Sequence, residues 1–327
     1  MTQALVDPHG VLVVDKPSGA TSHDIVAQAR RIFRTPRIGH AGTLDPLATG
    51  VLVLLFGEAT KLSEVATLTR KTYRAELCFG RSTDSHDADG ATTEEASGAL
   101  GPIDGAALEA AFVAERVRTL QVPPVVSAIK LHGRRAHALS RRGTPPDLAA
   151  RPVCVESLTL VGHHENTLTL ELTVSKGYYV RALARDLSQA LGVPAHLSGL
   201  RRLVSGDFTL REACAWPPAP PIHLLPLRTL LARLLPVVRL SNSGVLRAQR
   251  GQLLQPPDFL DDPERALTPS GGADPTTVWA WTDSVGRPIA LGRRDTEGFR
   301  VRRGFMAEAG TGEEPTECCI FKDISTG

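Results

Sequence analysis

The sequence has few features that would place the protein in a membrane or in an oxidising compartment. Its five cysteines are an odd number without a CxxC pair, which argues against a zinc site and a disulfide framework. No apolar run approaches the roughly 20 residues of a membrane span, and the N-terminal stretch MTQALVDPHG lacks the apolar core of a signal peptide. We therefore expect a protein of the cytoplasm.

The signatures of several enzyme classes are also missing. The sequence contains no P-loop, no GxGxxG and no GxSxG elbow, so a hydrolase built on Ser127 or Ser175 has no support from spacing. Metal binding has as little support, because two histidines are merely adjacent and two more lack nearby cysteines or paired carboxylates: His163 and His164, and His132 and His137. We expect neither a metal nor a cofactor.

Charge is nearly balanced, at a formal +2 from 37 basic and 35 acidic residues. Any attraction to nucleic acid must therefore come from local clustering. Such a cluster lies in the segment 122–152, where two Pro-Pro pairs bracket five cations against the lone acid Asp147: Lys130, Arg134, Arg135, Arg141 and Arg142. A charge run is usually a solvated loop, and phosphate contact is the alternative.

The 327 residues, 42% of them hydrophobic, are enough for two domains. Apolar runs and alternation predict strands at 10–17, 51–56, 71–79 and 166–175, with helices capped by Ser22 and over 104–118 and 180–191. Past the Pro-rich stretch 216–221, compact strand candidates predict a small, mostly β domain: 237–241, 277–283, 288–294 and 298–304. The stretch 255–276 and the tail from about 307 favour loop or disorder.

One loop can hold a carboxylate rigidly. In GHAGTLDPLATG, at 39–50, three glycines and Pro46 impose a shaped loop, and the proline biases Asp45 away from helical geometry. From the residues alone, Asp45 either caps the turn through its side chain or serves a reaction.

Long, ordered blocks extend well beyond that loop: GVLVVDKPSGATSHD at 10–24, RIGHAGTLDPLATGVLVLLFGEATK at 37–61, KTYRAELCFGRSTDSHDADG at 71–90, SAIK at 127–130, SKGYYVRALARDL at 175–187 and LRRL at 200–203. Together they resemble the TruB family, the bacterial tRNA pseudouridine-55 synthases, over about residues 10–212. The chain departs from that pattern at Tyr178, where the family usually has threonine, and at Val125 and Val126, where a tyrosine is common.

The resemblance implies roles for individual residues. Asp45 would be the catalytic aspartate, Tyr73 the tyrosine that stacks on the target base, and Arg181 the arginine that pairs with the aspartate. His40 would help to position the flipped-out nucleotide. Four further residues would line or support the pocket: Lys16, Asp87, Tyr179 and Leu200. The basic segment 122–152 would grip RNA, whereas for Arg185 we keep the reading of a solvated helix face.

The resemblance also implies an architecture and a partner. The expected fold is α+β: a pseudouridine synthase domain over 1–230 with a mixed, largely antiparallel sheet flanked by helices and loops. A small PUA-like RNA-binding domain over 237–306 and a flexible tail over 307–327 would follow. The expected activity is isomerisation of uridine 55 in the T-loop of tRNA, by a monomer without an obligate protein partner.

Chemistry supports the residue types. A carboxylate is a natural partner for a sugar carbon with oxocarbenium character, and a guanidinium keeps it ionised and oriented. Residue order leaves open whether Asp45 attacks C1′, attacks the base or abstracts a sugar proton. A noncatalytic RNA-binding or RNA-folding protein is the competing hypothesis, and it predicts that Asp45→Asn leaves the biological role intact.

Overall fold

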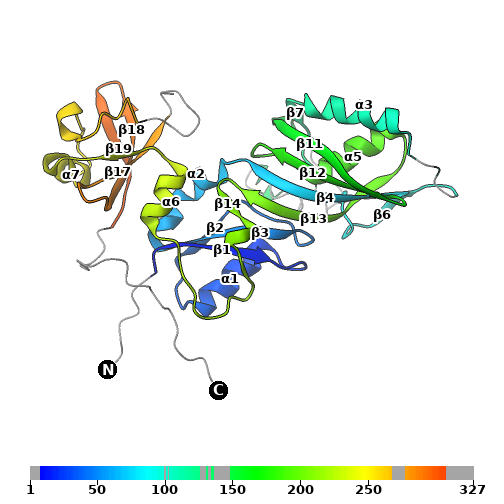
Figure 1. The fold of residues 1–327 in the computed structure, drawn as a ribbon, viewed down its shortest axis with the longest axis horizontal. Helices are drawn as coiled ribbons and strands as arrows, with labels where there is room; N and C mark the ends of the chain where they lie inside the picture. Colours follow the sequence, from blue (N-terminus) through cyan, green and yellow to red (C-terminus); the bar gives the residue numbers. More distant parts are fainter. Residues whose placement is uncertain are drawn as a thin grey trace, which may run out of the picture.

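The computed structural model describes residues 8–98, 101, 103–125, 130–131, 134–135, 148–266 and 277–306. These residues build one large sheet, which runs through most of the molecule, and one small sheet near the C-terminus (Figure 1). The predicted cations Arg141 and Arg142, the stretch 267–276 and the tail 307–327 lie outside the described residues.

The large sheet has nine strands within the described part of the chain. Its main path runs β11 (Val155–His164), β12 (Thr167–Val174), β4 (Lys71–Phe79), β13 (Ala195–Ser205), β3 (Thr49–Phe56), β1 (Gly10–Lys16) and β15 (Cys214–Ala215), with β2 (Ile38–Ala41) paired to β3 and β14 (Phe208–Thr209) paired to β13. Only the β13–β3 and β1–β15 pairs among them are parallel. The predicted α+β fold with a mixed, largely antiparallel sheet is thereby confirmed.

The apolar run of β3 is buried on both faces of the sheet. Leu52, Leu54 and Phe56 join a core that includes the buried face of α1 (Ser22–Ile32). The residues between them, such as Val53 and Leu55, join a second core beneath α6 (Leu227–Leu234). Figure 1 shows α1 on one side of this strand and α6 on the other. A strand covered on both faces reads as a continuous apolar run, so 51–56 was recognisable from sequence.

The helix expected at Ser22 forms, but its predicted N-cap is wrong. Thr21 caps α1, because its hydroxyl accepts the Asp24 amide and the Asp24 carboxylate accepts the Thr21 amide in return. Ser22 is the first helical residue, and its side chain bonds elsewhere. The predicted helices at 104–118 and 180–191 are α3 (Gly105–Arg116) and α5 (Val180–Leu191), which contact each other beside the large sheet.

The small sheet contains the four strands expected from sequence: β16 (Val237–Arg239), β17 (Val278–Thr282), β18 (Pro288–Asp295) and β19 (Gly298–Gly304). Sequence patterns did not predict the helices α6 and α7 (Asn242–Gln249). Trp281 is fully buried in this sheet's own core, while Ala280 and Leu291 pack in the core shared with α6. The small sheet is thus in apolar contact with the large unit.

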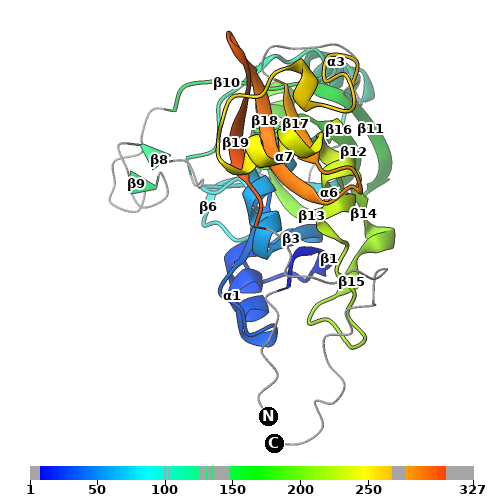
Figure 2. The same ribbon diagram turned by 90° about the vertical axis from the view of Figure 1, so that its left-hand side faces the viewer.

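Short elements complete the chain. They are α2 (Ser63–Thr67), three 3-10 helices (Gly57–Leu62, Leu210–Glu212 and Pro256–Asp258), the paired β5 (Arg81–Thr83) and β6 (Thr92–Glu95), the paired β7 (Leu120–Gln121) and β10 (Arg151–Pro152), and the paired β8 (Lys130–Leu131) and β9 (Arg134–Arg135). Figure 2 shows β8 and β9 standing to one side of the large sheet. Among the described residues, no helix is long and apolar enough to cross a membrane.

Candidate active site

Asp45 lies in the loop that joins β2 to β3. Gly42 adopts a φ of 89°, in the left-handed region that glycine tolerates and other residues rarely adopt. Gly50 also has a positive φ, of 98°, and a Cβ there would overlap the carbonyl of Arg202 on the neighbouring strand. Gly42 allows the sharp loop that the Gly-rich sequence predicted, and Gly50 allows β3 to lie directly against β13.

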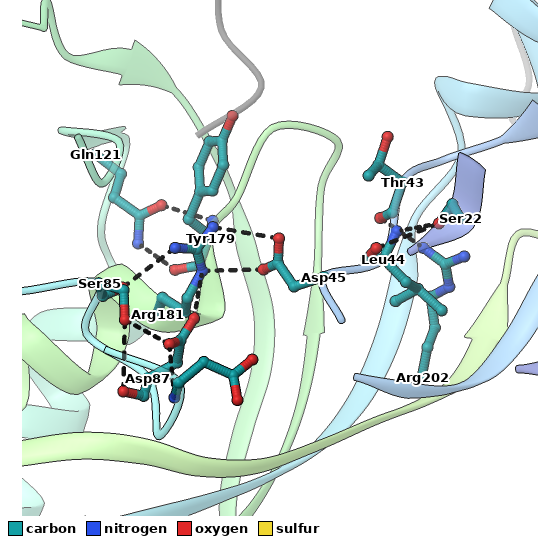
Figure 3. Close-up of polar contacts among 11 residues, drawn as sticks. Ser22, Thr43, Leu44, Asp45, Ser85, Asp87, Gln121, Tyr179, Arg181 and Arg202 are labelled. Carbon is teal, nitrogen blue, oxygen red and sulfur yellow. Dashed lines mark hydrogen bonds and ion pairs between the residues drawn. The ribbon is translucent and has the colours of Figure 1, made fainter. Parts of the chain in front are cut away.

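Ser22 holds the backbone of this loop. Its buried hydroxyl accepts the Leu44 N–H at 2.8 Å and donates to the Leu44 carbonyl at 3.2 Å. Figure 3 shows this reciprocal contact next to Asp45. One hydroxyl group thus satisfies both the N–H and the carbonyl of Leu44. Because Leu44 directly precedes Asp45, this contact fixes the loop to the start of α1.

Two buried cations hold the same loop from other directions. The Arg202 guanidinium donates to the carbonyls of Gly42 at 3.1 Å and Val51 at 2.7 Å. The Lys16 ammonium donates to the carbonyl of Pro46 at 3.3 Å, besides two carbonyls in its own turn. The loop is therefore held on both sides of Asp45 by side chains from β13 and β1.

Arg181, on the first turn of α5, forms a two-pronged ion pair with Asp45. Its Nε lies 2.9 Å from one carboxylate oxygen and its Nη2 lies 3.2 Å from the other. The guanidinium side chain is 6% exposed and the carboxylate side chain 37% exposed. A fork of this kind fixes the direction of the carboxylate as well as its distance, and it leaves Asp45 accessible.

Asp87 is a second carboxylate on the same guanidinium. It is buried, and one of its oxygens lies 3.5 Å from Arg181 Nε. Its other oxygen accepts from the hydroxyl of Ser85 and from the Asp89 amide. The Ser85 carbonyl in turn accepts from Arg181 Nη1 at 3.1 Å. Asp87 therefore supports Arg181 from behind and does not line the cavity.

A cavity of about 260 Å³ opens beside Asp45. This is just below the roughly 300–1,000 Å³ of pockets for drug-sized ligands, so it suits a single small ring. Tyr73 reaches the cavity from β4 and Leu200 from β13, two strands that pair side by side. Five predicted site residues meet at its wall: Asp45, Tyr73, Tyr179, Arg181 and Leu200.

The surroundings of the cavity are strongly positive. Lys71 and Arg202 line it, Lys16 lies under its loop, and all three side chains are buried. Burial lowers the pKa of Lys71 to about 8 and that of Lys16 to about 8, although the Asp45 charge opposes the effect on Lys16. Among the described residues, none of the three forms an ion pair; their donors reach carbonyl oxygens, and Arg202 also bonds the side chain of Tyr73.

His40, on β2, is not part of the cavity wall. Burial, aided by the nearby His23 and Arg202 charges, lowers its pKa to about 4, so the ring is neutral near pH 7. Its ring lies edge-on to that of His23, with centroids 5.4 Å apart, and its Nδ1 is buried without a hydrogen-bond partner. The predicted role of His40 in holding a nucleotide is not tested by this arrangement.

The structure describes three of the five cations that were expected to grip RNA. The backbones of Lys130, Arg134 and Arg135 form the short β8–β9 pair, while Arg141 and Arg142 lie outside the described residues. Arg185 is less solvated than expected, because its guanidinium bonds Asp186 at 2.7 Å and the Val122 carbonyl at 3.1 Å. RNA contact by this segment remains a prediction.

Several structural contributors went unrecognised in the sequence. The sequence predicted Ser22 as a helix cap. Lys71 and Arg202 lie within the family-like blocks, but a buried cation has no local sequence signature. Gln121 and Glu115 had no signal at all: Gln121 bonds the backbone of Tyr179, and Glu115 accepts the Tyr178 hydroxyl at 2.7 Å. Within the described ranges, no cluster of three or more His, Cys, Asp or Glu residues could hold a metal ion.

Comparison with solved structures shows the fold. The chain superposes on a crystal structure of a Cbf5-Nop10-Gar1 complex with a TM-score of 0.68 at 23% identity, covering 91% of this chain and 84% of that one. It superposes on an H/ACA RNP bound to a substrate RNA containing 2′-deoxyuridine with a TM-score of 0.63 at 20% identity, covering 91% and 85%.

Comparison of sequences identifies the family. Residues 30–180 match the model for the N-terminal domain of TruB family pseudouridylate synthases. The chain is 40% identical to tRNA pseudouridine synthase B of Thermobifida fusca, covering 86% of this chain and 93% of that protein. It is 39% identical to the protein of the same name from Mycobacterium tuberculosis, covering 90% and 94%. Because this identity extends over most of both chains, the chain belongs to the TruB family of pseudouridylate synthases.

Proposed function

We propose that this protein converts uridine 55 in the T-loop of tRNA to pseudouridine. The observation that carries the proposal is the fork between Arg181 and Asp45 at the wall of a small cavity that also contains the ring of Tyr73. The family relatives named tRNA pseudouridine synthase B support tRNA as the substrate. The T-arm stem-loop would be the part that the enzyme recognises.

The reaction needs little more than an oriented carboxylate and a place to turn the base. The N1–C1′ bond breaks, uracil turns within the cavity, and C5 bonds to C1′. The C5 proton leaves and N1 gains a proton, so the change is redox-neutral. Asp45 would attack or stabilise the electron-poor sugar carbon, add to the base, or remove a sugar proton. In each case Arg181 holds the carboxylate in one direction.

The target base must leave the RNA stack before it reaches Asp45. Flipping requires a few kcal/mol, and stacking on an aromatic ring offsets part of this. Tyr73 is 9% exposed and lines the cavity, so its ring would receive the base. The buried cations Lys71 and Arg202 would attract the phosphate backbone next to it.

We also propose the division of labour along the chain. Residues 1–230 would form the catalytic domain, with the segment 122–152 gripping RNA through Lys130, Arg134, Arg135, Arg141 and Arg142. Residues 237–306 would form a PUA-like RNA-binding domain. The enzyme would act as a monomer, and size-exclusion chromatography with light scattering checks that expectation.

The test replaces Asp45 by asparagine, which keeps size and hydrogen bonding but removes the negative charge. Purified Asp45→Asn protein should form no pseudouridine in a tRNA transcript. The matched control is Asp261→Asn, because Asp261 accepts an equally two-pronged contact from Arg239 and neither residue lines the cavity. The control should keep full activity. An Asp45→Asn protein that works at the wild-type rate would refute the proposal and favour a noncatalytic RNA-binding role.

A further inference from the structure

Gln121 forms a paired contact with the peptide backbone of the site. Its side-chain carbonyl accepts the Tyr179 N–H at 2.8 Å, and its amide group donates to the Tyr179 carbonyl at 3.3 Å. The residue is 1% exposed. Figure 3 shows the carboxamide facing Tyr179, on the side opposite to Asp45. One side chain thus satisfies both backbone groups of a residue in the cavity wall.

Tyr179 occupies the position from which α5 starts. It is the N-cap of the helix, and no side chain of its own caps the first turn. Its carbonyl also accepts the amides of Ala182 and Leu183. Arg181 follows two residues later. A displacement of the Tyr179 peptide would therefore move both the Tyr179 ring and the guanidinium that orients Asp45.

The contact links the site to the two ends of the segment 122–152, where β7 and β10 pair. Gln121 ends β7, directly before that segment, and pairs with Arg151 of β10, which lies at the C-terminal end of the segment. The Val122 carbonyl accepts from Arg185, one turn further along α5. Two successive residues, Gln121 and Val122, therefore bond the start of α5 and the helix itself.

A second buried group, Glu115, holds the residue next to Tyr179. The Tyr178 hydroxyl donates to Glu115 at 2.7 Å, and Glu115 also accepts from Arg118. Burial and the Glu115 charge raise the pKa of Tyr178 well above its usual value, which keeps the hydroxyl as a donor. Among the side chains of the described residues, only that of Gln121 bonds the Tyr179 peptide groups.

We propose that Gln121 is a positioning residue: its carboxamide holds the Tyr179 peptide and thereby sets Tyr179 and Arg181 for the reaction at Asp45. The inference rests on the proposed function and deepens it. A merely structural buried amide would lower stability when removed but would leave the chemical step unchanged. A positioning residue would slow that step, because displacements of about 1 Å at a reacting group change rates by roughly 10²-fold.

The test compares Gln121→Met with Gln28→Met. Methionine keeps the length of the side chain and removes both hydrogen-bonding groups. Gln28 is a matched control, because it also makes a side-chain hydrogen bond, from Trp216 at 2.7 Å, and does not line the cavity. Three quantities are measured for each: the single-turnover rate at saturating tRNA, the dissociation constant for tRNA, and the melting temperature.

Gln121→Met should lower the single-turnover rate about 10- to 100-fold and leave the dissociation constant within about twofold, since no phosphate contact is removed. Gln28→Met should keep the wild-type rate even where its melting temperature falls equally. Equal rates for the two folded variants would overturn the positioning role.

Gln121→Glu keeps the test decisive if the methionine variant does not fold. Its carboxylate can still accept the Tyr179 N–H but cannot donate to the Tyr179 carbonyl, so its rate should lie below that of the wild type. Where both variants fold, it should lie above that of Gln121→Met. A wild-type rate for Gln121→Glu would overturn the proposal. A wild-type chain that forms no pseudouridine would instead refute the proposed function, and this inference with it.

Discussion

Two regions of the molecule contain nearly the same Asp–Arg fork in different surroundings. Arg181 contacts Asp45 at 2.9 and 3.2 Å, and Arg239 contacts Asp261 at 3.0 and 2.7 Å. The Arg181 side chain is 6% exposed, whereas that of Arg239 is 52% exposed. Fork geometry alone therefore does not mark a catalytic site. The cavity pair differs by its buried guanidinium, its aromatic neighbour and the cations around it.

The supports of the two forks differ as well. The hydrogen bond from Arg239 lowers the pKa of Asp261, and the Arg239 amide adds to it, but the pair has no second carboxylate behind it within the described residues. Arg181 also contacts Asp87 and the Ser85 carbonyl. The loop before Asp45 is fixed by Ser22. A rigid, supported fork can orient a reacting group, whereas an exposed one ties a loop to a strand.

The largest contrast is expected from replacing the two arginines by lysine. Lysine keeps the charge but cannot reproduce the fork. Arg181→Lys should lower the single-turnover rate of pseudouridine formation by about 10²-fold or more. Arg239→Lys should leave that rate unchanged. Comparable losses in both variants would mean that the cavity pair has no special role.

The aromatic residues offer the next contrast. Tyr73→Leu removes the ring that would receive the flipped base, and the loss of stacking is worth about 1–3 kcal/mol, or roughly 5- to 150-fold in rate. Phe259→Leu removes a buried ring from the small sheet's core, where it meets Trp281 and Phe299 edge-on. The second variant should melt earlier but react normally. If Phe259→Leu lowers the rate at saturating tRNA and Tyr73→Leu does not, the assignment of the base-binding ring is wrong.

Salt dependence separates the basic segment from the C-terminal sheet. Each phosphate contact contributes about 0.7–0.9 to the slope of log affinity against log salt. Changing both Arg141 and Arg142 to alanine should reduce that slope for a T-arm stem-loop by roughly 1.4–1.8. Changing both Arg302 and Arg303, on β19, should reduce it less. Titrations by filter binding from low to physiological salt measure both slopes, and equal reductions would contradict the difference between the regions.

The last contrast concerns acid stability and leaves the reaction itself untouched. The pKa of His40 is lowered to about 4, so between its unfolded value near 6.5 and pH 4 the unfolded chain binds more protons. Stability present above pH 6.5 is lost as the pH falls through that window, by up to about 3 kcal/mol at roughly 1.4 kcal/mol per pKa unit. His40→Gln should flatten the curve of unfolding free energy there. Asp261→Asn should act only at lower pH, because the pKa of that carboxyl is depressed from 3.8. An unchanged curve for His40→Gln would contradict the burial argument.

Local patterns predicted the elements that have a clear apolar period. The strand at 71–79 alternates buried and exposed residues, and α5 has its apolar residues on one face. β13 was missed because its sequence, AHLSGLRRLVS, carries polar residues and a fully buried arginine, Arg202. Burying that cation depends on carbonyls of the Asp45 loop, which lies far away in the sequence. No local pattern contains that information.

The candidate site shows the same division. Asp45, Tyr73 and Arg181 were recognised because ordered blocks surround each of them, and the structure brings all three to one cavity. Gln121 was invisible because its partner is a peptide group, which every residue has. Ser22 was assigned to the wrong task because serine at a helix start usually caps it, whereas here Thr21 caps α1 and frees Ser22 for Leu44.

The most direct measurement is a structure of the protein bound to a T-arm stem-loop that carries 5-fluorouridine at the target position. Our account predicts that the modified nucleotide is flipped out into the cavity, with its ring against Tyr73 and its sugar or base beside the Asp45 carboxylate. Arg181 should still contact both oxygens of Asp45 unless one has bonded to the nucleotide. A target base that stays stacked in the RNA, or that binds away from Asp45, would contradict the central claim.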